Sequence, residues 1–470
     1  MERGTGRRLR RFLPVTALAA LTGLLPVLGG AATLSSAQAV QRPWWPAAMG
    51  FDDLQRAGGT GKGITIAVLD DVIDPNAADI KGRVASSESV CWDKVSTGTG
   101  PEADHATEIA QLLVGTGVSA NGMPGVRGIA PQATLRHYTI GYGEKLRCTP
   151  GDEKHLDTTE AAITKALEDG AKIISMSYGK PGTDDEVRRA VVEAQHAGAI
   201  LVGATGDKVL DFPSGYNGVV AVNACDREGK ISAFAAPYTG NGIAFCAPGV
   251  GMALGNHDKQ GRWLPQGMLV DGSSYAAPLV AGGLAAYWSK YPKATANQVL
   301  QAAVHNPGMK QGTSTTGKKG WIWWYRREGS GFPTIVNSSR TGFGWGMFDA
   351  ADLMSVDPST YPDTNPLVGD GGIYGPTAQE IAAGRLLPKA TSSSPSSAAG
   401  TATATATSAP RPSGGSAAGP MAPTSSTSSG VPAWVWVVVA VLVLLLAGGA
   451  VMFTRRGSGT RPAVRPGEGT

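Results

Sequence analysis

Hydrophobic and polar residues alternate in a way that predicts both strands and helices between residues 60 and 290. Largely apolar runs, which are typical of strands buried on both faces, occupy residues 64–69, 172–176, 200–204 and 219–224. Apolar residues at helical spacing lie between these runs, over residues 158–170 and 187–194. Strands that alternate with helices indicate repeated β-α-β units. We therefore expect an α/β domain in three layers, with a mainly parallel sheet and helices on both faces.

The two ends of the chain have the composition of targeting and anchoring segments. Residues 1–39 combine clustered arginines with an apolar stretch and end in Ala37-Gln38-Ala39, which predicts a secretory signal peptide. The alternatives are a first transmembrane helix and export by the twin-arginine route, which the spacing to Phe12 disfavours. Residues 431–453 carry no charge and are long enough to span a bilayer, which predicts a transmembrane helix.

Residues that flank this predicted helix indicate its orientation. Arg455 and Arg456 follow it, which places the tail 454–470 in the cytoplasm and the folded domain outside the cell. Residues 371–430 are rich in Pro, Ser, Thr and Ala and are predicted to form a flexible linker. Residues 40–60 are predicted to be an N-terminal extension that packs on the domain surface. The expected location is the cell membrane, with a single pass.

The net charge of +4 is unevenly distributed. Residues 1–39 carry +4 and residues 454–470 carry +3, which leaves −3 for the segment between them. A mildly acidic domain with basic ends is unsuited to a phosphate backbone. No nucleic-acid partner is therefore expected.

All four cysteines fall in the segment that is predicted to be exported: Cys91, Cys148, Cys225 and Cys246. An even number of cysteines in an oxidising compartment favours disulfides, and three pairings are open. We favour the two pairs of sequence neighbours, 91–148 and 225–246, which close the shortest loops. No CxxC or HxxH spacing occurs, so no metal site is predicted.

Three segments carry candidate chemistry. Asp70 directly follows the first apolar run, where an aspartate is often only a cap. His105 begins an expected helix, and a lone histidine is more often structural than catalytic. Ser274 lies in Gly-Ser-Ser-Tyr-Ala-Ala-Pro at residues 272–278, which opens a helix expected to run to Lys290. A serine at a helix N-terminus lies among free backbone N–H groups, as a developing oxyanion requires.

The three segments occur in the order Asp, His, Ser, which is the order of the subtilisin arrangement among serine proteases. Residues 61–370 resemble a subtilisin-type peptidase domain. Further motifs carry the resemblance: Gly-Ile-Ala-Pro at 128–131, Ser-Met-Ser-Tyr-Gly at 175–179, Ala-Pro-Gly at 247–249 and Gly-Phe-Gly-Trp-Gly at 342–346. We therefore expect a subtilisin-like fold for this segment.

The resemblance implies a serine endopeptidase that hydrolyses protein or peptide substrates without a cofactor. Ser274 would be the nucleophile and His105 the general base, while Asp70, with Asp71 as its rival, would orient the histidine. The other histidines are not expected to have such partners; they are His137, His155, His196, His257 and His305.

The resemblance also implies where a substrate lies. The backbone of Ser177, Tyr178 and Gly179 would pair with an extended peptide, and the Tyr178 side chain would narrow the subsites. The facing wall of the side-chain pocket would be formed by Ala204, Thr205 and Gly206.

The sequence departs from the family at the oxyanion position. The family has an asparagine there, whose side chain donates to the oxyanion, and this chain has Asp207. An ionised carboxylate would repel the oxyanion, and the loss of one such donor costs about 2.7–4 kcal/mol in the transition state. Burial that raises the pKa of Asp207 would instead let it donate as a neutral acid.

The overall layout resembles the mycosins, which are membrane-anchored proteases associated with type VII secretion in actinobacteria. This resemblance implies a cell-surface enzyme with a type VII secretion complex as its partner. The alternative is a weakly active or inactive structural subunit of such a complex. The aromatic and basic segment 318–327 is predicted to form a hairpin that packs on the domain or docks a partner.

Overall fold

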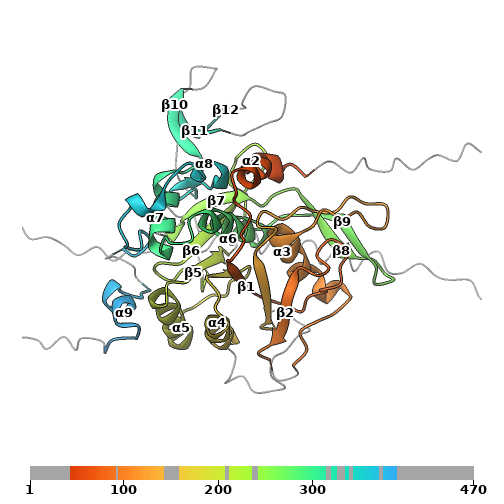
Figure 1. Ribbon diagram of the computed structural model, residues 1–470, viewed down its shortest axis with the longest axis horizontal. Coiled ribbons are helices and arrows are strands. Elements are labelled where there is room, and N and C mark those ends of the chain that lie inside the picture. Colours follow the sequence, from red (N-terminus) through yellow and green to blue (C-terminus); the bar gives the residue numbers. More distant parts are fainter. Residues whose placement is uncertain are drawn as a thin grey trace, which may run out of the picture. The chain divides into compact units, whose positions relative to one another are not determined.

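Eight strands form the central sheet, in the order β13-β7-β6-β5-β4-β1-β3-β2. Figure 1 labels β7, β6, β5, β1 and β2 of this sheet. Every adjacent pair in this sheet is parallel. The strands are β1 (Thr65–Asp70), β2 (Val84–Ser89), β3 (Thr134–Thr139), β4 (Ile173–Met176), β5 (Ile200–Ala204), β6 (Val220–Cys225), β7 (Phe245–Pro248) and β13 (Gly346–Met347). The prediction of a mainly parallel sheet is confirmed.

This computed structural model describes the backbone of part of the chain and most of the side chains on it. The described residues are 43–91, 94–141, 158–206, 211–234, 242–313, 319–324, 334–337, 342–369 and 374–388. For those between 309 and 337, only the backbone is described. All of them lie within one compact unit, Met1–Ala390. The predicted signal peptide, transmembrane span and cytoplasmic tail fall outside the described residues. Within the described ranges, no helix combines the length and the apolar character needed to cross a membrane.

Both faces of the sheet are buried, as the largely apolar runs predict. On β1, Ile66 and Val68 belong to one hydrophobic cluster, while Ala67 and Leu69 belong to a second cluster. Successive side chains of a strand point to opposite faces, so the two clusters lie on opposite sides of the sheet.

Helices cover both faces and complete the three layers. On one side, α6 (Ser273–Lys290) contacts strands β4 to β7 and packs against α3 (Asp104–Val114). On the other side, α4 (Thr158–Glu168) and α5 (Asp185–His196) lie side by side (Figure 1). The last long helix, α7 (Ala296–His305), follows α6 and contacts it.

Two smaller antiparallel sheets lie outside the central one. A hairpin is formed by β8 (Met252–His257) and β9 (Trp263–Val270), directly before α6. A three-stranded sheet is formed by β10 (Met309–Thr313), β11 (Lys319–Trp324) and β12 (Thr334–Asn337). The segment 318–327, predicted to be a hairpin, therefore contributes the middle strand of three.

The N-terminal extension contributes to the core as well as to the surface. Its helices are α1 (Trp45–Ala48) and α2 (Phe51–Arg56). Trp45, Phe51 and Leu54 are fully buried in the larger hydrophobic cluster. The described part of the N-terminal extension thus packs on the domain with three large apolar side chains in its core.

Part of the segment that was expected to be linker is folded. Helix α9 (Ala378–Ala383) begins with a capping box in which Thr377 and Glu380 satisfy each other's backbone N–H groups. The Glu380 carboxylate also accepts from the guanidinium of Arg188 on α5, at 2.6 Å. This nearly buried ion pair connects α9 with α5. Further short helices in the described part of the chain are α8 (Ala350–Leu353) and the 3-10 turns η1 (Pro101–Ala103) and η3 (Pro358–Thr360).

One predicted disulfide is confirmed. Cys225 at the end of β6 is bonded to Cys246 on β7, with the two Cα atoms 6.1 Å apart. Cys91 is also disulfide-bonded. Its predicted partner, Cys148, lies outside the described residues, so the 91–148 pair stays a prediction.

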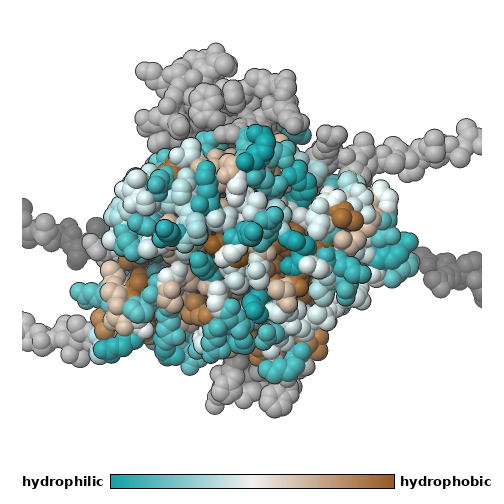
Figure 2. All heavy atoms as spheres, in the orientation of Figure 1, coloured by the Kyte–Doolittle hydropathy of each residue, from teal (hydrophilic) through white to brown (hydrophobic). Residues whose placement is uncertain are grey.

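The outer surface is mixed in character. Figure 2 shows a largely hydrophilic face on which apolar residues lie in small separate groups. The large apolar side chains that are exposed in the described ranges are Val95, Val118, Phe234, Met268, Leu269 and Tyr374.

Candidate active site

The carboxyl edge of the parallel sheet brings Asp70 and His105 together. Asp70 is the last residue of β1, and its Oδ1 lies 2.7 Å from Nδ1 of His105. The backbone N–H of Asp71 donates to the same oxygen at 2.8 Å. The carboxylate of Asp70 is buried, whereas 30% of the His105 side chain is exposed. Asp70, and not its rival Asp71, is therefore the hydrogen-bond partner of the histidine.

His105 lies in the first turn of α3, and the buried side of this helix fixes its position. The 3-10 turn η1 leads directly into the helix. From Ala106 to Val114 every residue of α3 is buried. The imidazole consequently projects from a rigid element, with its Nδ1 held by Asp70.

The charge of Asp70 controls the titration of His105. Burial disfavours the imidazolium and lowers the pKa of His105. The negative charge and the hydrogen bond of Asp70, with smaller contributions from Glu108 and Asp71, outweigh burial and hold this pKa above its usual range. Asp70 thus stabilises the imidazolium that forms when a histidine at this position accepts a proton as a general base.

Ser274 lies in the first turn of α6, which is fixed from both sides. The hydroxyl of Ser273 donates to the carbonyl oxygen of Thr205, beyond the end of β5. The carbonyl oxygen of Ser274 accepts from the hydroxyl of Ser177, beyond the end of β4, at 2.8 Å. The turn is therefore held by the two segments that were predicted to bind substrate.

A close backbone approach at this turn requires a glycine. The N–H of Gly272 donates to the carbonyl oxygen of Gly249 at 2.7 Å. A Cβ on Gly249 would lie 2.6 Å from the carbonyl oxygen of Gly272 and 2.7 Å from Cβ of Ala224. A side chain at 249 would push α6 away from the sheet and displace Ser274.

Tyr275 connects the helix of Ser274 with the helix of His105. Its ring lies 5.8 Å from the His105 ring, centroid to centroid. Its hydroxyl donates to Glu108 Oε2 at 3.0 Å, one helical turn beyond His105. These contacts place the first turn of α6 beside the first turn of α3, with Ser274 next to Tyr275.

Glu108 is a buried carboxyl group that sequence reasoning missed. Only 2% of the residue is exposed, and its Oε1 has no hydrogen-bond partner. Burial raises the pKa of Glu108 to about 8, against the opposing effects of His105 and the Tyr275 hydroxyl. The spacing of three residues from His105 was the available signal, since such residues share a helix face.

Comparison with known proteins identifies the domain. The sequence pattern of the subtilase family matches residues 61–346. The chain belongs to the subtilase family. A thermostable alkaline protease from Halalkalibacterium halodurans is 32% identical over 262 residues, which are 55% of this chain and 66% of that protein. Subtilisin DY from Bacillus licheniformis is 28% identical over 256 residues, which are 53% of this chain and 85% of that protein.

The chain also resembles solved structures. Fervidolysin from Fervidobacterium pennivorans, a keratinolytic enzyme related to subtilisin, is 21% identical with a TM-score of 0.49. The alignment covers 68% of this chain and 46% of fervidolysin. The sequence match to the alkaline protease spans just under two thirds of that protein's length. The membership of residues 61–346 in the subtilase family rests on the family pattern that matches them.

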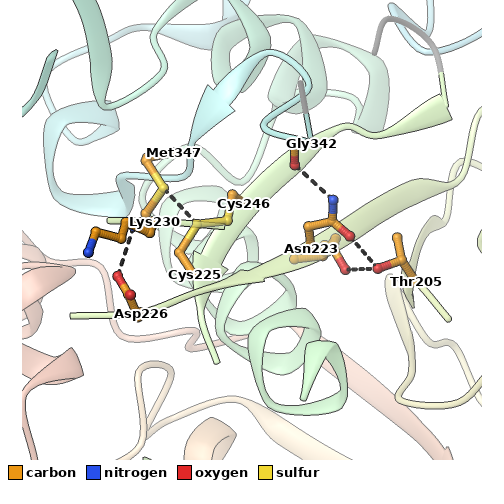
Figure 3. Close-up of a disulfide and its surroundings, with 9 residues drawn as sticks. Thr205, Asn223, Cys225, Asp226, Lys230, Cys246, Gly342 and Met347 are labelled. Atoms are coloured by element: carbon orange, nitrogen blue, oxygen red, sulfur yellow. Dashed lines mark hydrogen bonds between the residues drawn. A yellow bond between two sulfur atoms is a disulfide. The ribbon is translucent and has the colours of Figure 1, made fainter. Parts of the chain in front are cut away.

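The predicted substrate-binding residues of this subtilase lie on two neighbouring segments. Ser177 and Gly179 follow β4, and Thr205 and Gly206 follow the adjacent strand β5. The hydroxyl of Thr205 donates to the side-chain oxygen of Asn223 on β6 (Figure 3). The Nδ2 of Asn223 in turn donates to the Gly342 carbonyl oxygen at 2.8 Å. The two predicted pocket walls are thus tied to the sheet and to the serine turn.

The side chain of Tyr178 points away from the predicted side-chain pocket. The side chain of Tyr178 is 5% exposed and lies in the hydrophobic cluster that α4 and α5 cover. Its hydroxyl donates to Thr159 on α4 at 3.1 Å. The expectation that this side chain narrows the subsites is wrong, because it packs on the opposite side of the sheet from α6. Asp207 lies outside the described residues.

A second histidine of the subtilase domain has carboxylate partners, contrary to expectation. His257 at the end of β8 is fully buried, with Nδ1 at 2.6 Å from Asp104 Oδ1 and Nε2 at 3.2 Å from Asp74 Oδ2. Its own backbone N–H also donates to Asp104, at 2.8 Å. The prediction that only His105 has such partners is wrong, because residues 153 and 183 positions away in the sequence fold onto His257.

His137 on β3 lies behind the site and remains neutral. Burial lowers its pKa to about 4, against the charge of Asp70 and a hydrogen bond from Nε2 to the Asp71 carbonyl oxygen at 2.7 Å. His137 therefore positions the backbone after Asp70 without adding charge. Among the described residues, no group of three or more His, Cys, Asp or Glu side chains is arranged to hold a metal ion.

Proposed function

We propose that this subtilase is an endopeptidase that cleaves peptide bonds through Asp70, His105 and Ser274. The observation that carries the proposal is the 2.7 Å contact of a buried Asp70 with a partly exposed His105, beside the first turn of α6. Asp–His pairs next to a serine at a helix N-terminus support acyl transfer.

In the proposed reaction, Ser274 Oγ attacks the carbonyl carbon of the scissile bond while its proton passes to Nε2 of His105. Asp70 holds the imidazole by Nδ1 and stabilises the imidazolium. The carbonyl oxygen becomes an oxyanion, which the backbone N–H groups at the start of α6 stabilise. The amide bond then breaks, the amine leaves with the proton from His105, and water releases the acyl group by the reverse sequence.

Cleavage of a peptide library tests this reaction. The full chain is incubated with peptides derived from a proteome, and new termini are identified by mass spectrometry. We expect new termini with the wild type and with Ser355→Ala, which changes an exposed serine far from α6 in sequence. Ser274→Ala should remove them, since loss of such a nucleophile lowers kcat about 10⁶-fold. Equal cleavage by Ser274→Ala and wild type would contradict the proposal.

Asp207 gives the proposal a pH dependence that can be checked. If Asp207 donates to the oxyanion as a neutral acid, activity should fall as pH rises through its pKa. Asp207→Asn should remove that fall, because an amide donates at every pH. A pH profile unchanged by Asp207→Asn would contradict this role.

We further propose that the enzyme is a mycosin-type protease, anchored in the cell membrane and associated with a type VII secretion complex. Support comes from the arginine-rich N-terminal segment, the uncharged stretch 431–453 and the linker composition before it. Membrane fractionation with a C-terminal tag tests the anchor: the protein should remain with the membrane after a carbonate wash. Release into the wash would contradict the anchor.

The alternative function is a structural subunit of the same complex. The carboxyl group of Asp207 at the oxyanion position favours this alternative. It predicts that Ser274→Ala preserves secretion and that the wild type cleaves the peptide library no more than this variant does. The protease proposal predicts cleavage by the wild type and none by Ser274→Ala.

A further inference from the structure

A carboxyl group other than that of Asp70 lies close to His105. Glu108 follows His105 by three residues on α3, and residues at this spacing share one face of a helix. Only 2% of Glu108 is exposed, whereas 30% of the His105 side chain is exposed. Glu108 therefore lies in the buried part of the helix, one turn beyond a histidine that solvent can reach.

The surroundings of Glu108 allow its charge state to change. Its Oε2 accepts from the hydroxyl of Tyr275 on α6 at 3.0 Å, and its Oε1 has no hydrogen-bond partner in the described part of the chain. Burial disfavours the carboxylate and raises the pKa of Glu108 to about 8, although the Tyr275 hydroxyl opposes this rise. The group is thus neutral in weakly acidic solution and ionised in alkaline solution.

Charged groups on α3 and at the end of β1 also face Glu108. Besides burial, the charge of His105 lowers the pKa of Glu108, and the charges of Asp104 and Asp70 raise it. The influence is mutual: against burial, Asp70 first, then Glu108 and Asp71 bring the pKa of His105 to about 9. Because the two pKa values are similar, the charge of each group affects the titration of the other.

We propose that Glu108 is a positioning residue whose carboxylate acts through His105, by stabilising the imidazolium that forms when the histidine accepts the proton of Ser274. This inference rests on the proposed function. The described hydrogen bond of Glu108 goes to Tyr275 and not to His105, so its effect on the histidine is that of a charge. Because the carboxylate is buried, little solvent screens this charge. The effect should appear only where Glu108 is ionised.

The pH profile of kcat/KM tests the inference. The full chain and Glu108→Gln are assayed between about pH 5 and about pH 11 with a peptide that the library shows to be cleaved. Below about pH 6 the two proteins should agree, because Glu108 is then neutral in the wild type as well. At high pH the imidazolium of Glu108→Gln lacks the nearby charge. Its kcat/KM should be roughly 3- to 10-fold lower there, and its rise should occur at a pH lower by roughly 0.5–1.

Glu102→Gln is the matched control. Glu102 precedes His105 by three residues, as Glu108 follows it by three, but Glu102 is exposed. Solvent screens an exposed charge, so Glu102→Gln should reproduce the wild-type profile. All of these proteins keep Asp207, so any pH dependence that arises at the oxyanion position is common to them.

Tyr275→Phe provides a second variant. It removes the hydroxyl that favours ionised Glu108, so the carboxyl group should stay neutral up to a higher pH. Relative to the wild type, kcat/KM should fall in the alkaline range and should not change below about pH 6. In the Glu108→Gln background the same change should leave the shape of the profile unaltered, since no carboxyl group remains there to titrate.

The outcomes distinguish this inference from the proposed function. A loss of activity in Glu108→Gln by the same factor at every pH, or a profile that coincides with that of the wild type, overturns the inference and leaves the endopeptidase standing. If Glu108→Gln does not fold, a Tyr275→Phe profile that coincides with that of the wild type overturns the inference in the same way. Absence of cleavage by a folded wild type overturns both.

Discussion

His105 and His257 both lie within hydrogen-bond distance of carboxylates, and Asp104, which contacts His257, directly precedes His105 in the chain. The two sites differ in access. The His105 side chain is 30% exposed, whereas the His257 side chain is fully buried. Both ring nitrogens of His257 face carboxylate oxygens, while at His105 the described carboxylate contact is to Nδ1.

This difference separates a histidine that can exchange a proton with a substrate from one that cannot. A general base needs one nitrogen directed at the reacting group and one held by an orienting partner. The Nδ1 atom of His105 is held by Asp70, and its side chain is 30% exposed beside the first turn of α6. His257 instead cross-links β8, α3 and the segment after β1, so the structure assigns it to stability. A His–Asp pair alone does not mark a catalytic site.

The largest effect is expected when the carboxylate of Asp70, which orients His105, is replaced by a neutral amide. Asp70→Asn should lower kcat/KM by about 10⁴-fold, because the histidine loses its orienting partner. Activity requires neutral His105 and therefore rises with pH through its pKa. Since Asp70 holds this pKa above its usual range, Asp70→Asn should move the rise to lower pH. The pH profile of kcat/KM measures both effects.

Thermal unfolding provides the control for that variant. Above the pKa of His105, Asp70→Asn should melt much as the wild type does, because the amide keeps the shape of the carboxylate and the imidazole is neutral in both proteins. At lower pH the variant should be less stable, because the carboxylate no longer stabilises the imidazolium. A rise in activity at the same pH in Asp70→Asn and in wild type would contradict the pairing of Asp70 with His105.

The matched change at the other histidine should affect stability more than catalysis. His257→Phe removes the partner of buried Asp74 and of partly exposed Asp104, and the loss of one member of a buried pair costs about 3–5 kcal/mol. Urea unfolding measures this loss. The kcat of the folded fraction should change far less than in Asp70→Asn. A stable His257→Phe variant that has lost its activity would reverse the roles assigned to the two histidines.

Tyr275→Phe tests the carboxyl group that lies one turn beyond His105. The variant keeps the ring beside His105 but removes the donor to buried Glu108, which should cost about 1–3 kcal/mol of stability. Burial raises the pKa of Glu108 above its unfolded value, so its contribution is present at low pH and is lost as pH rises through about 8. The Tyr275 hydroxyl stabilises the ionised form of Glu108 more than the neutral form. The loss of stability in Tyr275→Phe should therefore be larger above pH 8, where Glu108 is ionised, than below pH 5.

Glu108→Gln is the control for this smallest effect. Its side-chain oxygen still accepts from Tyr275, but the group no longer titrates. We expect the stability of Glu108→Gln to depend less on pH than that of the wild type between about pH 5 and pH 8. Identical pH dependence in the two proteins would show that Glu108 does not titrate in this range.

The sequence predicts those parts of the fold that local patterns determine. The runs at 200–204 and 64–69 correspond to β5 and, within one residue, to β1, because strands buried on both faces must be continuously apolar. The helix expected to end at Lys290 does so. Asp70 and His105 meet because each follows a local rule: one ends a strand, and the other begins a helix over the same edge.

Contacts between distant residues were not predictable in this way. Asp104 and Asp74 lie 153 and 183 positions from His257, and no periodicity links them. Trp45 enters the core, although the sequence around it does not show which of its apolar residues face the domain. Tyr178 was expected near the substrate, and only the packing of α4 shows that its ring turns the other way.

Active-site labelling tests the central claim most directly, since a fluorophosphonate reacts only with a serine that a neighbouring base activates. The full chain, Ser274→Ala and Asp207→Asn are treated with the probe, and the modified peptide is identified by mass spectrometry. The account predicts that the wild type is labelled at Ser274 and that Ser274→Ala is not labelled. A folded wild type and a folded Asp207→Asn variant that both remain unlabelled would contradict it.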